Sequence, residues 1–201
     1  MKRLIYLVAA SCALLFLVSC QGSPSSTGGV NAIADLDQEN EVAMIMEVIE
    51  KETSCFFARD YDCWKETWVN EDYAFQAWSN SDGTYDAKVG WHEVDRRIGN
   101  YIKDHPLEEG GSFVHPDVER LNLRTKFYGD KVAYLTWEQY NSNQEETSYQ
   151  ISQEVRLMEK VDGEWKIVTV AAFWDYLNPV GAGTFTQVDS YPFKAQWVKT
   201  Q

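Results

Sequence analysis

The segment from Thr147 to Tyr176 constrains the fold more than any other part of the chain. Its two arms meet at Asp162-Gly163, a pair that suits the tight turn between antiparallel strands because it tolerates positive φ. Apolar and polar side chains alternate in the first arm, which predicts a strand with two different faces. The second arm is apolar on both faces, as expected for a central strand that is covered on one side and lines a space on the other. We therefore expect a long hairpin within an antiparallel sheet.

Strict alternation assigns the side chains of both arms to faces. The first arm has an apolar set and a mostly polar set, namely Tyr149, Ile151, Val155 and Leu157 against Gln150, Ser152, Glu154, Arg156 and Met158. The second arm has two apolar sets, namely Trp165, Ile167 and Phe173 against Val168, Val170, Ala172 and Trp174.

The N-terminal segment has the features of an export signal. Lys2 and Arg3 precede an apolar run that is short for a membrane span and is followed by a Gly/Ser-rich stretch. Leu17-Val18-Ser19-Cys20 resembles the bacterial lipobox, in which the cysteine is acylated. We expect a lipoprotein signal peptide over residues 1–19, and over residues 20–32 the acylated Cys20 and a flexible tether. An ordinary cleaved signal is the alternative.

The rest of the chain is expected to form one domain over residues 33–178, with a C-terminal extension over residues 179–201. The formal charge of −13 does not favour binding to nucleic acid, because the phosphate backbone is also negatively charged. No His or Cys cluster has the spacing of a metal site, and no cofactor is indicated. Cys55 and Cys63 remain in the exported domain, where a disulfide and separate burial as free thiols are equally open.

Two helices are predicted before the first strand. Leu36 to Arg59 carries apolar residues at helical spacing, and Glu52 lies in the same stripe. Such an acid lies either at a solvated rim or buried with a shifted pKa. A short second helix follows, from Asp60 as N-cap to about Asn70, and its large rings indicate either core packing or a cavity wall.

A third helix is predicted from Val89 to Asp104, where apolar residues again recur at helical spacing. Asp95 lies beside the apolar stripe, and His92 lies one turn earlier. The two form either a plain surface pair or a hydrogen-bonded dyad that would fix the tautomer of the imidazole. Arg96 and Arg97 follow directly, and either could neutralise Asp95 instead.

Further strands are predicted over Tyr73–Trp78, Val118–Tyr128 and Lys131–Asn141. In the last of these, alternation places Ala133, Leu135, Trp137 and Gln139 on one face. Three helices followed by at least four consecutive antiparallel strands predict an α+β domain.

This order of elements, ending in Asp162-Gly163-Glu164-Trp165-Lys166-Ile167-Val168, resembles the nuclear transport factor 2-like superfamily and in particular its SnoaL-like members. The segments Phe56–Trp68 and Trp91–Tyr101 also match, and the resemblance covers about Val42 to Trp174. It implies a cone-shaped, cystatin-like fold in which three N-terminal helices pack on a curved antiparallel sheet around an open, largely apolar pocket. Members include isomerase-like, dehydratase-like and cyclase-like enzymes, and also binding or assembly domains.

Three functions fit these features, and we favour the first. It is binding of a small apolar or sugar-like ligand, for which the expected pocket residues are Trp64, Trp68, Tyr73, Trp78, Trp91, Tyr140 and Trp174. The second is isomerase, dehydratase or cyclase chemistry with Asp95 or Glu52 as base and His92 or a tyrosine as proton donor. The third is a homodimer or protein-interaction module.

The expected location is the bacterial cell envelope, with the lipid bilayer contacted through acylated Cys20. Gln21 does not resemble the aspartate that retains lipoproteins at the inner membrane, so the outer membrane is preferred.

Overall fold

The structure is a computed structural model that describes residues 28–107, 117–143 and 145–182. Its helical elements are α1 (Gly28–Ala58), α2 (Tyr61–Glu66), α3 (Trp91–Val94), a π-helical turn η1 (Asp95–Gly99) and α4 (Asn100–Asp104). Its strands are β1 (Phe75–Ser79), β2 (Tyr85–Val89), β3 (Val118–Tyr128), β4 (Val132–Ser142), β5 (Ser148–Val161) and β6 (Glu164–Gly181).

The strands form one six-stranded sheet in the order β2-β1-β6-β5-β4-β3. The predicted hairpin is confirmed as β5 and β6, and both turn residues have positive φ, 52° at Asp162 and 89° at Gly163. The sheet is mixed rather than purely antiparallel, because β6 pairs in parallel with β1. These two strands are far apart in the chain and are not joined by a tight turn, so nothing forces them to run in opposite directions.

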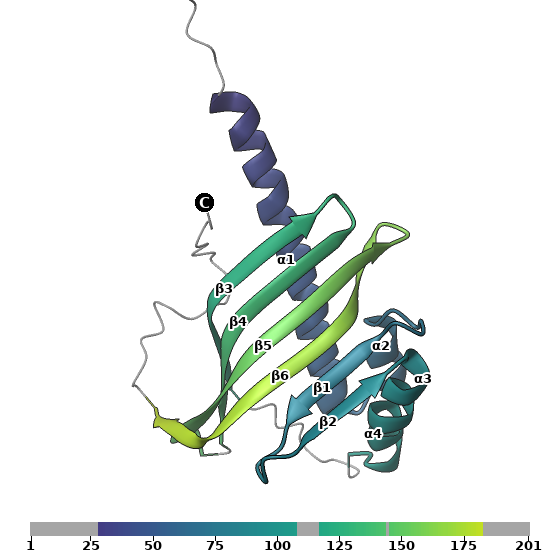
Figure 1. Ribbon diagram of the computed structural model, residues 1–201, viewed down its shortest axis with the longest axis vertical. Coiled ribbons are helices and arrows are strands. Elements are labelled where there is room, and N and C mark those ends of the chain that lie inside the picture. The colour runs from purple at the N-terminus through teal and green to yellow at the C-terminus, as the bar shows by residue number, and fades with distance from the viewer. Residues whose placement is uncertain (1–27, 108–116, 144, 183–201) are drawn as a thin grey trace, which may run out of the picture.

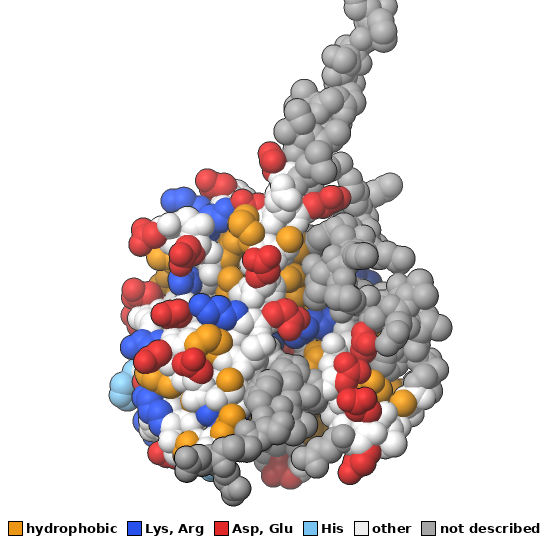
Figure 2. Space-filling model, turned by 180° about the vertical axis from the view of Figure 1, so that it is seen from behind, with side chains coloured by type: hydrophobic (Ala, Val, Ile, Leu, Met, Phe, Trp, Pro, Cys, Tyr) orange, Lys and Arg blue, Asp and Glu red, His pale blue; other side chains and the backbone are white. Residues whose placement is uncertain are grey.

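One face of the sheet, the inner face, packs against α1, and the shorter helices gather beside β1 and β2 (Figure 1). Val42, Ile45, Met46 and Ile49 of α1 are buried in this core, together with Ala133, Leu135 and Trp137, which the sequence pattern had placed on one face of β4. On the helix side of the molecule, acidic and basic side chains are interspersed (Figure 2). The core therefore lies between α1 and the inner face of the sheet.

A β-bulge in β6 changes which side chains face inward. Met158 pairs with Ile167 but Leu157 pairs with Thr169, so β6 has one extra residue at Val168. The bulge reverses the alternation beyond it. The inner face therefore carries Trp165 and Ile167 before the bulge and Val170, Ala172 and Trp174 after it. The predicted faces of the second arm were wrong from Val168 onward.

Several element bounds differ from the sequence prediction. Helix α1 begins at Gly28 rather than Leu36. Helix α2 ends at Glu66 instead of near Asn70, because Trp68 already pairs with Ile167 of β6. Strand β2 was not predicted, and β6 continues to Gly181.

Cys55 and Cys63 form a disulfide, with their Cα atoms 5.6 Å apart. This settles the alternative that the sequence left open, and it ties the end of α1 to the start of α2. Among the described residues, no helix is long and apolar enough to cross a membrane. The predicted signal peptide and Cys20 lie outside the described residues, as does most of the predicted C-terminal extension.

Candidate functional site

A cavity of about 440 Å³ opens between the C-terminal end of α1, the segment from η1 to α4, and the inner face of the sheet. We call it the cone cavity. Its lining includes Glu52 and Phe56 from α1, Tyr101 from α4, Trp78 from β1, Arg156 from β5 and Trp174 from β6. Its size is in the range of sites for small molecules.

Aromatic rings form the walls of the cone cavity. Phe56 and Tyr101 stack with centroids 5.8 Å apart and planes 10° apart. The guanidinium of Arg59 lies 5.1 Å from both centroids, which stabilises the pair. Trp78 packs under the guanidinium of Arg97 at 5.5 Å, and Trp174 stacks on a neighbouring tyrosine. The walls are therefore flat and held in place by ring stacking and by guanidinium groups that pack on the rings.

Small side chains on β6 leave the space that the cavity occupies. Cross-strand pairing places Val170 between Arg156 of β5 and Gln76 of β1. In the next row Ala172 lies between Glu154 and Trp78. Since neighbouring strands are only about 4.8 Å apart, a short side chain flanked by two long ones creates a hollow on the sheet.

A buried ion pair lies on the sheet side of the cavity. Nη1 of Arg156 donates to Glu154 at 2.7 Å, and the hydroxyl of Ser152 donates to the other carboxylate oxygen at 2.6 Å. All three residues are buried. The guanidinium also lies 5.0 Å from the ring centroid of Trp137, so both charges are held within a packed layer.

Glu52 reaches the cavity from the opposite side, on α1. Its carboxylate accepts a hydrogen bond from Nε1 of Trp64 at 3.0 Å. Burial raises the pKa of Glu52 above its ordinary value, although the nearby charge of Arg156 and the bond from Trp64 act in the opposite direction. A carboxyl group with a raised pKa in a cavity can act as a general acid or base near neutral pH.

Three polar atoms of the lining residues are buried and have no hydrogen-bond partner within the described part of the chain. They are Oε1 of Gln76, Nε of Arg156 and Nδ2 of Asn141. Beside them Gln139 is fully engaged, since it accepts from Arg120 at 3.0 Å and donates to Asn141 at 3.1 Å. Buried polar groups normally find partners, so these three atoms indicate a place for a polar ligand group.

The structure brings three of the residues predicted from sequence to the cone cavity, namely Glu52, Trp78 and Trp174. Trp64, Trp68 and Trp91 instead pack on one another behind it, with centroids 5.6 to 6.4 Å apart. The first two are almost fully buried, because α2 places Trp64 in the core and the bridge to Ile167 of β6 places Trp68 there.

The two predicted pocket tyrosines lie elsewhere. Tyr73 is half exposed and donates to Glu159 at 2.8 Å. Tyr140 lies beside Glu138, on the face of β4 opposite to Gln139, since alternation turns it away from the inner face.

Asp95 and His92 do not pair with each other in the structure. The ring of His92 is exposed, and its Nδ1 meets the carboxylate of its neighbour Glu93 at 3.1 Å. Asp95 accepts from the hydroxyl of Tyr61 at 2.8 Å, and burial together with this bond raises the pKa of Tyr61 to about 12. Gly99 makes room for that arrangement, since a Cβ there would clash with the Asp95 carboxylate.

Sequence reasoning missed the polar inner face of β5. Ser152, Glu154 and Arg156 had been grouped as one face of the first arm, but nothing in the pattern showed that this face points inward. A weak signal existed, because the same face carries Met158 and belongs to a central strand. Gln76, Gln139 and the ring of Phe56 were missed for the same reason.

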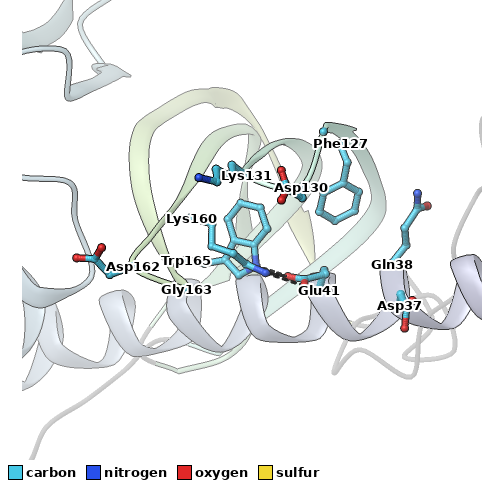
Figure 3. Close-up of a pocket in the computed structure, with 11 residues that line it drawn as sticks. Asp37, Gln38, Glu41, Phe127, Asp130, Lys131, Lys160, Asp162, Gly163 and Trp165 are labelled. Atoms are coloured by element: carbon cyan, nitrogen blue, oxygen red, sulfur yellow. Dashed lines mark hydrogen bonds and ion pairs between the residues drawn. The ribbon is translucent and has the colours of Figure 1, made fainter.

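A second hollow, of about 590 Å³, lies between α1 and the turns that join β3 to β4 and β5 to β6 (Figure 3). Its centre is Glu41, which binds Nζ of Lys160 at 2.6 Å and Nε1 of Trp165 at 2.7 Å. These groups satisfy one another, so they join the helix to the hairpin rather than await a ligand. In the described ranges, no three His, Cys, Asp or Glu side chains are grouped to hold a metal ion.

No protein-family model and no curated protein matches the chain. Solved structures do match. LinA is 15% identical over 75% of this chain and 95% of its own, with a TM-score of 0.50. An NTF-2-like protein of unknown function from Shewanella oneidensis MR-1 is 13% identical over 66% of this chain and 98% of its own, with a TM-score of 0.48. The association domain of Caenorhabditis elegans CaMKII is 14% identical over 68% of this chain and 97% of its own, with a TM-score of 0.49. With its helices packed on a six-stranded mixed sheet, the chain has an α+β fold, which it shares with LinA.

Proposed function

We propose that this chain is an envelope lipoprotein whose domain binds a small, largely apolar molecule in the cone cavity. The observation that carries the proposal is the cavity itself, a space of about 440 Å³ walled by rings such as Phe56, Tyr101 and Trp174. Flat apolar walls favour a flat apolar ligand, because burying each side of such a molecule removes apolar area from water at about 25 cal/mol per Å².

Filling the cavity tests the proposal. Ala172→Phe places a ring in the hollow between Glu154 and Trp78, so it should exclude a ligand while the sheet pairing is retained. The probe is prodan, an uncharged naphthalene ketone whose emission shifts to the blue in an apolar site. We expect the wild-type protein to bind prodan and Ala172→Phe to weaken binding about tenfold or more.

Ala87→Phe is the matched control, because Ala87 of β2 does not line the cavity, although it pairs with the lining residue Ala77 of β1. It should bind prodan as the wild type does. Equal binding by Ala172→Phe and the wild type would contradict binding in the cone cavity.

A second candidate function is acid–base catalysis, which the raised pKa of Glu52 favours. A carboxylate at this position can remove a proton next to the carbonyl of a bound ketone, and Arg156 would stabilise the developing negative charge. The test is proton exchange of the methyl group of 2-acetonaphthone in D₂O, followed by NMR. Catalysis predicts exchange above the buffer rate in the wild type and a return to the buffer rate in Glu52→Gln, with ligand binding retained.

The membrane anchor is a proposal that rests on the sequence alone. Cys20→Ser should move the full-length protein from the membrane fraction to the aqueous fraction of a bacterial host, because the acyl chains supply the anchoring free energy. Cys12→Ser is the control and should leave the protein with the membranes. A Cys20→Ser protein that stays with the membranes would contradict the anchor.

A further inference from the structure

The fixed charges that line the cone cavity are already paired. Arg156 is bonded to Glu154 at 2.7 Å, and Arg97 at the rim is bonded to Asp86 at 3.1 Å. On the α1 side, burial favours the neutral form of Glu52, whose pKa is raised. A charged ligand group would therefore enter without a free counter-charge and would lose its hydration.

The unpaired polar atoms of the lining include both hydrogen-bond donors and a hydrogen-bond acceptor. Nε of Arg156 is a donor, and so is Nδ2 of Asn141, whereas Oε1 of Gln76 is an acceptor. Arg156 and Gln76 line the cavity and are 6% and 7% exposed. A ligand group that accepts one hydrogen bond and donates another would satisfy both.

Register places Arg156 and Gln76 in one row of the cavity lining. They flank Val170 in a single row across β5, β6 and β1, with their Cα atoms about 10 Å apart, two strand spacings. The Arg156 side chain is held in place, because Nη1 donates to Glu154 and to the carbonyl of Val155. A planar group lying over Val170 can accept from Nε of Arg156 on one side and donate to Gln76 on the other.

From these observations we propose that the ligand is uncharged and carries a carboxamide-type group, with one hydrogen-bond acceptor and one donor, attached to a flat apolar body. The body lies between the rings of the wall, and the polar group lies over Val170 between Arg156 and Gln76. This inference rests on the proposed binding function and specifies the chemistry of the ligand.

Three probes of nearly equal shape test it, by displacement of prodan from the purified protein at pH 7. In 2-naphthamide the group donates and accepts, in 2-acetonaphthone it only accepts, and in 2-naphthoate it is an anion. We expect 2-naphthamide to bind about tenfold more tightly than the other two, because only it satisfies both Arg156 and Gln76. Equal binding of the amide and the ketone, or tighter binding of the anion, would overturn the inference.

The variant Gln76→Leu tests whether Gln76 causes the preference for 2-naphthamide. Leucine keeps the volume but cannot accept a hydrogen bond, so the variant should bind 2-naphthamide only as tightly as 2-acetonaphthone. Its thermal unfolding, followed by circular dichroism, checks that it is folded. Gln153→Leu, an exposed position on β5, is the matched control and should keep the tenfold preference. An unchanged preference in Gln76→Leu would overturn the inference.

The outcomes separate this inference from the proposed function. If prodan binds and Ala172→Phe blocks its binding, but the protein does not prefer 2-naphthamide over the ketone and the anion, the binding function stands and the inference fails. If neither prodan nor 2-naphthamide binds to the wild-type protein, both fail.

Discussion

Glu52 is the residue whose local environment has the clearest thermodynamic consequence. Its carboxyl group is bonded to Trp64 and lies in the field of Arg156, yet burial is the largest influence and raises its pKa. The folded protein therefore holds a proton on Glu52 over a range of pH in which the unfolded chain has lost it. By linkage, the free energy of unfolding falls as pH rises through this range, which begins near the ordinary value of 4.5.

Glu52→Gln should remove this pH dependence. Glutamine can still accept the hydrogen bond from Trp64 but cannot ionise, so the variant should gain stability relative to the wild type as pH rises from 4 to 8. The slope difference has an upper limit of about 1.4 kcal/mol per pH unit and is reduced by the partial exposure of the side chain. Urea unfolding of both proteins across this pH range measures it.

Glu47→Gln is the control for that measurement. Glu47 lies on the exposed side of α1, so its replacement should leave the pH dependence of the wild type unchanged. Parallel stability curves for Glu52→Gln and the wild type would show that Glu52 is ionised equally easily in the folded and unfolded states.

At the scale of elements, the sequence predicts those that local pattern determines. The β5–β6 hairpin could be predicted because Asp162-Gly163 sets the turn, and α1 because its apolar residues recur at helical spacing. Strand β4 alternates strictly, so the placement of Ala133, Leu135 and Trp137 on one face was also predicted correctly, although the pattern did not show that this face is the inner one. These features depend on residues that are close together in the chain.

Features that depend on distant pairing could not be predicted. The bulge at Val168 exists because β6 must match β5 on one side and β1 on the other, and its own residues show no break in pattern. Strand β2 is short and pairs only with β1 at the edge of the sheet. The bulge and strand β2 both depend on which strands pair with each other, and the local sequence pattern does not predict that pairing.

The candidate site was only partly predictable for the same reason. Glu52 could be identified because an acid in an apolar helical stripe is unusual. Glu154 and Arg156 alternate with apolar residues, as a solvated strand face also does, so their direction could not be read from the pattern. The bulge then decided that Ala172 and Trp174, rather than Phe173, face the cavity.

At the scale of the whole molecule, the outer face of the sheet carries no described helix (Figure 1). One row of paired residues crosses all six strands: Lys126, Tyr134, Leu157, Thr169, Phe75 and Val89. The next row contains Arg124, Thr136, Val155, Ala171, Ala77 and Ala87. Away from the basic edge on β3, the two rows form a continuous and mostly apolar surface, which is typical of an interaction site.

We therefore expect two copies of the chain to associate through this outer face. Tyr134→Glu places a charge in the first row, where burial in an interface would leave it without a partner, so dimer affinity should fall about tenfold or more. Sedimentation equilibrium measures the change. Met44→Glu, on the exposed side of α1, is the control and should leave the association unchanged. A wild-type protein that is monomeric at all accessible concentrations would contradict the homodimer, and a dimer that is equally stable with Tyr134→Glu would exclude the outer face as its interface.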